Sequence, residues 1–249
     1  MYDFDVKSTK YELVKWIKEW FRENGNGCNA IVGISGGVDS SVVAALCVEA
    51  LGKERVIGVR LPNGIQNDID DAYKLVNHLE IESIGINIEE TVGSILIGMA
   101  FENVKPSEQT KINLPARIRM STLYAVSQSL NGRVANTSNL SESYVGYDTR
   151  FGDSVGDFSP LFNLTKTEIK LIAKELNIPD TLIEKTPSDG LCGMSDEERF
   201  GFSYEELDKY IRYGFIDNVE HQVKIEEMHR KNAFKLKMMP CFEYKTQFL

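Results

Sequence analysis

The sequence lacks the apolar segments that mark membrane and exported proteins. No apolar run approaches the roughly 18–20 residues that a membrane-spanning helix needs. The N-terminus, from Met1 to Tyr11, is charged and has no apolar signal core. We therefore expect a cytoplasmic protein without a membrane partner.

Cysteine and histidine are also scarce. The four cysteines (Cys28, Cys47, Cys192 and Cys241) are scattered and form no C-x-x-C pair. The three histidines (His78, His221 and His229) do not occur at metal-ligand spacing. This distribution argues against structural zinc, thioredoxin-like chemistry and a disulfide framework, and it favours reduced, mostly buried thiols.

Positive charge is in deficit, with 28 Lys and Arg against 37 Asp and Glu, so the formal net charge is −9. A nucleic-acid coat requires a basic surface, and we expect no nucleic-acid partner. An acidic protein can still bind an anion where it concentrates positive charge locally. A length of 249 residues with 42% hydrophobic residues suits one α/β domain over residues 1–249.

Short apolar runs alternate with segments of helical periodicity along the chain. The runs predict strands at 29–34, 55–61, 83–88 and 133–136, and the periodicity predicts helices at 12–21, 42–51, 68–79, 91–101, 110–130, 165–176, 204–213 and 218–230. Strands separated by helices indicate a three-layer, doubly wound parallel sheet of Rossmann-like type, followed by a helical C-terminal part.

Several segments between these elements have a character of their own. The polar, Gly-rich stretch 139–160 is predicted to be a long functional loop, and 187–196 a second loop. Thr165 and Glu168 are spaced as a helix capping box. Pro115 is unusual inside the helix at 110–130, and the tail from Ala233 fits no element.

The most informative segment is Ser35-Gly36-Gly37-Val38-Asp39-Ser40, which follows a buried strand and opens a helix. Ligands of open parallel sheets bind at the carboxyl ends of strands, and free amides at a helix start attract an anion. The two glycines let the backbone approach a ligand closely. A carboxylate at Asp39 would repel phosphate unless a cation lies between them, so Asp39 is a natural Mg²⁺ ligand. The segment is neither a Walker A loop nor G-x-G-x-x-G.

This loop resembles the pyrophosphatase loop of the N-type ATP pyrophosphatases. Further segments resemble one group among them, the ammonia-dependent NAD synthetases, in order and spacing: 60–68, 113–120, 136–142 with 147–153 and 157–161, and 164–166 with 187–191 and 196–197. The resemblance extends over nearly the whole chain.

The resemblance implies a ligase that takes deamido-NAD, ATP and ammonia as substrates. The nicotinate carboxylate would attack the α-phosphorus of ATP and expel pyrophosphate, and ammonia would then convert the acyl adenylate to NAD and AMP. Adenylation turns a poor carboxylate leaving group into a good one, and positioning with charge stabilisation supplies the catalysis. The family also implies Mg²⁺ and a homodimer.

Roles follow from the same resemblance. The implied catalytic residues are Asp39, Lys166 and Thr137. The implied ATP-binding residues are Gly33, Ile34, Ser35, Gly36, Gly37, Val38, Asp39, Ser40, Arg60, Gln66, Thr137, Lys166 and Ser188. The implied deamido-NAD-binding residues are Arg117, Arg150, Asp157, His229 and Arg230, with help from Arg119. Asp39 and Glu142 are the implied metal ligands.

Three positions depart from the family pattern, and one of them, Ser188, keeps a hydroxyl where the family often has threonine. Arg150 stands where the family usually has lysine, which keeps the charge but changes the donor geometry. Arg230 follows His229 where the family has a His-Lys pair, and this leaves the register of that contact open. By itself each of these charged residues also fits an ordinary solvated surface position.

Two other functions remain open at this point. One is another ATP pyrophosphatase of the same loop type, GMP-forming or tRNA-modifying. The other is a non-catalytic nucleotide-binding module. Only 32 residues precede Gly33, too few for a glutaminase, so we expect free ammonia or a separate ammonia-supplying subunit.

Overall fold

A parallel sheet lies at the centre of the protein. The computed structural model describes residues 4–66, 69–185, 195–237 and 239–242. Within these residues four strands lie in the order β3-β2-β1-β4. Their bounds are β1 (Asn29–Gly33), β2 (Val56–Arg60), β3 (Glu82–Gly85) and β4 (Gly132–Ala135). Ile31 pairs with Ile57 on one side and Val134 on the other, so β1 is an inner strand of the sheet.

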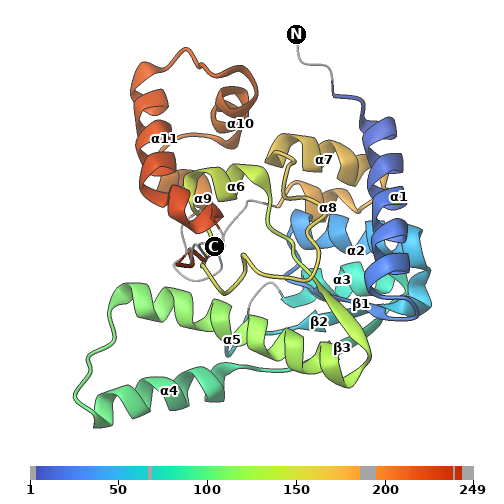
Figure 1. Cartoon of the computed structure of the whole chain (residues 1–249), viewed down its shortest axis with the longest axis horizontal. Coiled ribbons are helices and arrows are strands. Elements are labelled where there is room, and N and C mark those ends of the chain that lie inside the picture. Colours follow the sequence, from blue (N-terminus) through green and yellow to red (C-terminus); the bar gives the residue numbers. More distant parts are fainter. Residues whose placement is uncertain (1–3, 67–68, 186–194, 238, 243–249) are drawn as a thin grey trace, which may run out of the picture.

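Helices cover both faces of this sheet (Figure 1). One face packs against α1 (Val6–Asn24), α2 (Val38–Leu51), α3 (Ile69–Leu79) and α7 (Lys166–Glu175), whose apolar residues share one core cluster. The other face packs against α4 (Glu89–Phe101) and α5 (Glu108–Ser129) through a second cluster. The three-layer α/β arrangement predicted from the sequence is therefore confirmed.

The C-terminal half adds a helical group with its own apolar core. It comprises α6 (Leu140–Val145), α9 (Asp196–Phe200), α10 (Tyr204–Tyr213) and α11 (Val219–Asn232), followed by the 3₁₀ turn η2 (Ala233–Leu236). Val145, Phe200, Leu207 and Ile225 are buried together in it. A further short helix, α8 (Asp180–Ile183), follows α7. Figure 1 shows the helical group to one side of the sheet, with α6 toward the sheet.

The structure corrects part of the loop prediction. Residues 139–160 are not one structureless loop, because α6 lies inside them. Asn139 caps this helix by accepting a hydrogen bond from the Glu142 amide, and Gly146 ends it in the left-handed conformation, with φ of 70°. A helix of six residues is too short to show apolar periodicity in the sequence.

Element boundaries also differ from the predictions. Helix α2 begins at Val38, four residues earlier than predicted, so the glycine loop leads directly into its first turn. Strand β3 ends at Gly85, three residues before the predicted end. Helix α5 continues through Pro115, and Ser107 caps its start. The predicted capping box of Thr165 and Glu168 is confirmed at α7.

Candidate active site

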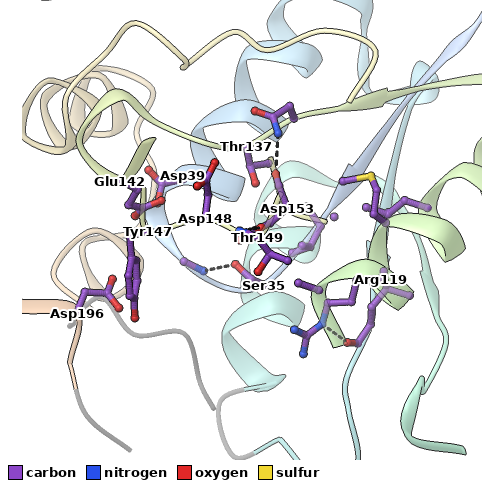
Figure 2. A pocket seen from close by; sticks show the side chains of 18 of the residues that line it. Ser35, Asp39, Arg119, Thr137, Glu142, Tyr147, Asp148, Thr149, Asp153 and Asp196 are labelled. Carbon is purple, nitrogen blue, oxygen red and sulfur yellow. Dashed lines mark hydrogen bonds between the residues drawn. The ribbon is translucent and has the colours of Figure 1, made fainter. Parts of the chain in front are cut away.

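A cavity of about 540 Å³ opens at the carboxyl ends of the strands, between the sheet and the C-terminal helical group. Its walls come from the loop after β1, from α5, from the end of β4 and from the segment 147–153. The start of α7 and the start of α9 close it on the remaining side. Figure 2 shows Asp39 and Glu142 close together in this cavity, with Arg119 on the opposite side.

The glycine loop forms one end of the cavity and brings the N-terminus of α2 to it. Gly36 has φ of 80°, and a Cβ atom there would lie 2.8 Å from the Asp71 Cβ. Glycine is therefore required at this position by both backbone conformation and space. Gly37 is the N-cap of α2 and has no side chain, so no side chain caps the first amides. These amides and the helix dipole favour an anion at this point.

Hydroxyl groups hold the loop in this shape. Ser35 Oγ accepts a hydrogen bond from the Gly37 amide at 3.2 Å and lies 3.1 Å from Ser40 Oγ. Ser40 and Ser41 donate to the Gly37 carbonyl at 3.1 and 2.8 Å. The loop is thus folded by its own side chains before any ligand arrives.

A buried lysine joins two carboxylates beside this loop. Lys166 is 3% exposed, and its Nζ lies 2.6 Å from Asp39 Oδ2 and 2.8 Å from Glu142 Oε1. Asp39 comes from the first turn of α2, Glu142 from α6 and Lys166 from the first turn of α7. Asn139 donates a further hydrogen bond to Asp39 Oδ1 at 3.1 Å. Three separate helix N-termini therefore meet at one charged cluster.

Burial and neighbouring charges shift the pKa values of Lys166 and Glu142. Burial by itself would lower the pKa of Lys166, but the carboxylates of Asp39 and Glu142 outweigh it and raise this pKa well above its usual range. Burial raises the pKa of Glu142, and the Lys166 ammonium opposes that shift. A helix N-terminus disfavours a cation, so the carboxylates also compensate the dipole of α7 at Lys166.

The donor set at this cluster fits Mg²⁺. Two carboxylates from different helices converge on one cation, the Lys166 ammonium. Within the residues that the structure describes, no group of three or more His, Cys, Asp or Glu side chains could hold a metal. Mg²⁺ is usually held by one or two carboxylates together with substrate phosphates and water, and the pair Asp39 and Glu142 matches that pattern.

Most residues implied by the resemblance to bind ATP line the cavity. Those that line it are Gly33, Ile34, Ser35, Gly37, Val38, Asp39, Gln66, Thr137 and Lys166, and the implied metal ligand Glu142 lines it as well. Gly36 and Ser40 are absent from the lining, although Ser40 hydrogen-bonds within the same loop. Arg60 stacks on the Tyr73 ring at 4.0 Å, away from the lining. Ser188 lies outside the described residues.

Five of the residues implied to bind deamido-NAD lie outside the cavity lining, whereas Arg119 lines the cavity and donates from Nε to the Leu61 carbonyl at 3.0 Å. Arg117 donates from Nε to the Arg150 carbonyl at 3.4 Å, and Arg150 lies over the Phe151 and Phe234 rings. Asp157 accepts hydrogen bonds from the Val134 amide and the Tyr124 hydroxyl.

The C-terminal pair lies apart from this group. His229 stacks on the Tyr144 ring with centroids 4.0 Å apart, and Arg230 is exposed at the end of α11. The ligand roles of the five residues stay predictions.

Sequence reasoning missed several polar residues of the site. Asp153, whose pKa burial raises to about 6, lines the cavity together with Asp148. Lys235, in η2, donates to the carbonyls of Gly146 and Asp148 at 2.6 and 2.8 Å and so holds the wall segment. Asp148 and Asp153 lie in segment 147–153, which resembles the family but was given no role at these two positions, and Lys235 lies in the tail that fits no predicted element.

Sequence reasoning also missed one acidic and one aromatic residue near the start of α9: Asp196, which lines the cavity, and Tyr204, which hydrogen-bonds it. Asp196 and Tyr204 lie beside Glu142, and Tyr204 hydrogen-bonds both carboxyl groups. Asp196 lies in segment 196–197, which resembles the family, but the resemblance assigned it no role.

Among the helices in residues 4–66, 69–185, 195–237 and 239–242, none combines the length and the apolar character of a membrane-spanning segment.

Comparisons with known proteins agree with this geometry. A family model described as NAD synthase matches residues 10–245. The NH(3)-dependent NAD(+) synthetase of Thermococcus sibiricus is 41% identical over 87% of this chain and 84% of its own length. The chain is similar to the solved structure of an NMN synthetase from Francisella tularensis, with a TM-score of 0.88 and 32% identity, over 97% of this chain and 100% of the other. It is also similar to an NH3-dependent NAD synthetase from Campylobacter jejuni, with a TM-score of 0.77 and 30% identity over the same shares.

Proposed function

The chain belongs to the NAD synthase family, and we propose that the cavity beside Lys166 is where it makes its amide bond. As an NAD synthetase it is a ligase that forms a carbon–nitrogen bond, with ATP and ammonia as substrates. The relatives reported above give no support to a GMP-forming or tRNA-modifying enzyme, or to a non-catalytic module.

The reaction has two steps, adenylation of the carboxylate and amidation of the acyl adenylate. A carboxylate oxygen of the nicotinate group attacks the α-phosphorus of ATP, and the bond to the pyrophosphate breaks. The nitrogen of ammonia then attacks the acyl carbon, loses a proton, and AMP leaves with the former carboxylate oxygen. Both steps develop negative charge on phosphate oxygens, so fixed positive groups accelerate them.

The residues of the cavity suit these needs. The uncapped amides of the α2 N-terminus face the cavity beside Ser35 and would bind the phosphates of ATP. Asp39 and Glu142 would hold Mg²⁺, and the bound metal would supply positive charge to the leaving pyrophosphate. Lys166 adds a permanently charged ammonium at the same place. Thr137, at the end of β4, would orient the nucleotide.

One observation carries the proposal: Lys166 joins Asp39 and Glu142 next to a free helix N-terminus. The experiment measures pyrophosphate release from ATP with deamido-NAD, ammonium and Mg²⁺. We expect release in the wild type and none in Asp39→Ala, whose fold should persist. Unchanged release in the variant would remove Asp39 from the mechanism.

A second candidate concerns the acceptor. The structural similarity to an NMN synthetase, with a TM-score of 0.88, exceeds that to the Campylobacter jejuni NAD synthetase, with 0.77. This observation favours the nicotinate mononucleotide as an alternative acceptor in the same cavity. The ratio of kcat/KM for deamido-NAD and for the mononucleotide decides between them, since both share the nicotinate carboxylate.

We also propose that the chain forms a homodimer through α4. This helix is mostly apolar, yet Val92 is its only buried residue, while Ile97 is 58% and Phe101 81% exposed. Such an exposed apolar face is typical of an interface between subunits. Ile97→Glu should convert the dimer to a monomer in analytical ultracentrifugation. A wild-type monomer at micromolar concentration would contradict this proposal.

We further propose a cytoplasmic location, where ATP is available.

A further inference from the structure

The hydroxyl of Tyr204 lies between two acidic side chains at the edge of the cavity. Its Oη is 3.1 Å from Glu142 Oε1 and 3.0 Å from Asp196 Oδ2. Tyr204 is the first residue of α10, whereas Glu142 belongs to α6 and Asp196 opens α9. One phenol therefore links three helices to the charged cluster of Lys166.

This phenol acts only as a hydrogen-bond donor toward the carboxylates. A phenol hydroxyl is protonated near neutral pH, and Tyr204 Oη lies within donating distance of both Glu142 Oε1 and Asp196 Oδ2. A hydroxyl carries one proton for donation. Glu142 and Asp196 thus share the one proton of this hydroxyl, and the position of the hydroxyl couples the two carboxyl groups.

Glu142 is held at one oxygen by two donors. Lys166 Nζ donates to Oε1 at 2.8 Å, and Tyr204 donates to the same atom at 3.1 Å. Hydrogen bonds to an ionised carboxylate are strong and directional. Together they fix the rotation of the carboxyl group and direct its other oxygen away from both donors.

The ring of Tyr204 is itself rigidly placed. Tyr204 is 6% exposed, and its ring meets the Phe200 ring edge-on at 5.6 Å between centroids. Its amide donates to Glu197 Oε1 at 2.8 Å, and Lys166 Nζ lies 5.1 Å from its ring centre. The hydroxyl therefore has little freedom to leave the two carboxyl groups.

We propose that Tyr204 is a positioning residue that orients the Glu142 carboxyl for Mg²⁺ and ties it to Asp196. The inference rests on the proposed role of Asp39 and Glu142 as metal ligands. Groups that hydrogen-bond a metal-ligating carboxylate orient it and typically contribute about 10- to 100-fold to metal affinity or activity.

The test removes the hydroxyl and keeps the ring. In Tyr204→Phe the packing on Phe200 and the contact with Lys166 remain possible. The matched control is Tyr210→Phe in the same helix, where the hydroxyl donates to Glu226 Oε1 at 3.0 Å and does not line the cavity. Tyr204→Phe loses the phenol's contacts with Glu142 and Asp196, and Tyr210→Phe loses its phenol-to-carboxylate hydrogen bond with Glu226.

Metal binding is measured directly, with Mn²⁺ as the probe. Electron paramagnetic resonance follows Mn²⁺ binding to the full chain in the presence of a non-hydrolysable ATP analogue. We expect Tyr204→Phe to weaken Mn²⁺ binding about tenfold and Tyr210→Phe to leave it unchanged. In turnover, the KM for Mg²⁺ should rise far more than kcat falls, because saturating Mg²⁺ restores the occupied site.

The outcomes separate this inference from the proposed function. If Asp39→Ala weakens Mn²⁺ binding but Tyr204→Phe does not, the metal site stands and the role of Tyr204 is refuted. If Asp39→Ala also leaves Mn²⁺ binding unchanged, the metal site itself is wrong and the inference falls with it. A fall in kcat for Tyr204→Phe that saturating Mg²⁺ does not restore would refute positioning through the metal.

Discussion

Replacing Lys166 with methionine tests whether one ammonium holds the charged cluster together. The side chain of Lys166 is 4% exposed and makes ion pairs of 2.6 and 2.8 Å with Asp39 and Glu142. Methionine has a similar length and fills the same space without charge. In Lys166→Met the two carboxylates would face each other with no cation between them.

The cost follows from the burial of the partners. Removing one member of a buried ion pair typically costs about 3–5 kcal/mol. The side chains of Asp39 and Glu142 keep 17% and 20% exposure, so water partly solvates them after the change. We therefore expect a cost at or below the bottom of that range, about 2–3 kcal/mol. At about 2–4 °C per kcal/mol for a chain of this size, Tm should fall by about 4–12 °C.

The assay is thermal unfolding with and without Mg²⁺, and Lys174→Met is the control. Lys174 lies in the same helix and pairs with Glu184 at 3.6 Å, with side-chain exposures of 57% and 64%. Exposed pairs contribute about 0–1 kcal/mol, so the control should barely change Tm. Mg²⁺ should raise the Tm of Lys166→Met more than that of the wild type, because the metal replaces the lost cation.

Two results would refute this reasoning. An unchanged Tm in Lys166→Met without Mg²⁺ would mean that the ion pairs contribute nothing to the fold. Equal stabilisation of wild type and variant by Mg²⁺ would mean that the metal does not bind between the two carboxylates.

Three further changes have distinct expected outcomes. Gly36→Ala places a Cβ 2.8 Å from the Asp71 Cβ in a residue with φ of 80°. This strain should lower Tm and raise the KM for ATP. Unaltered values of both would show that the loop accepts a side chain at this position. Burial raises the pKa of Asp153 to about 6, so ionising this carboxyl group destabilises the fold. This loss of stability is absent below the pKa of the unfolded chain and grows as the pH rises toward 6. Asp153→Asn should therefore raise Tm at pH 7.5 more than at pH 4, and the reverse order would contradict the direction of the shift. Arg117→Ala should raise KM for deamido-NAD far more than KM for ATP, and equal effects would argue against its assignment.

The local part of the site was predictable because its signal is local. A branched apolar run followed by Ser35-Gly36-Gly37 and a helix requires only neighbouring residues to form a strand, a turn and a helix N-terminus. The alternation of such units likewise predicted the parallel sheet. The short helix α6 was not predicted, because its cap Asn139 and its end at Gly146 bracket too few residues for a periodic pattern.

The assembled part of the site could not be read from periodicity. Asp39 and Lys166 are separated by 127 positions and meet only because α2 and α7 pack on the same face of the sheet. Their association was implied by family resemblance alone. The link from Tyr204 to Glu142 and Asp196 had no signal, because a tyrosine at a helix start usually only packs against its neighbours.

The central claim is that the nicotinate carboxylate attacks the α-phosphorus of ATP in the cavity beside Asp39 and Lys166. The most direct measurement uses an acceptor whose carboxylate carries ¹⁸O, with ATP, Mg²⁺ and ammonium, and follows the label by mass spectrometry. We predict that AMP gains one ¹⁸O for each amide formed by the wild type, and that Asp39→Ala forms no labelled AMP. Amide formation with unlabelled AMP, or with the label in pyrophosphate or phosphate, would contradict the account.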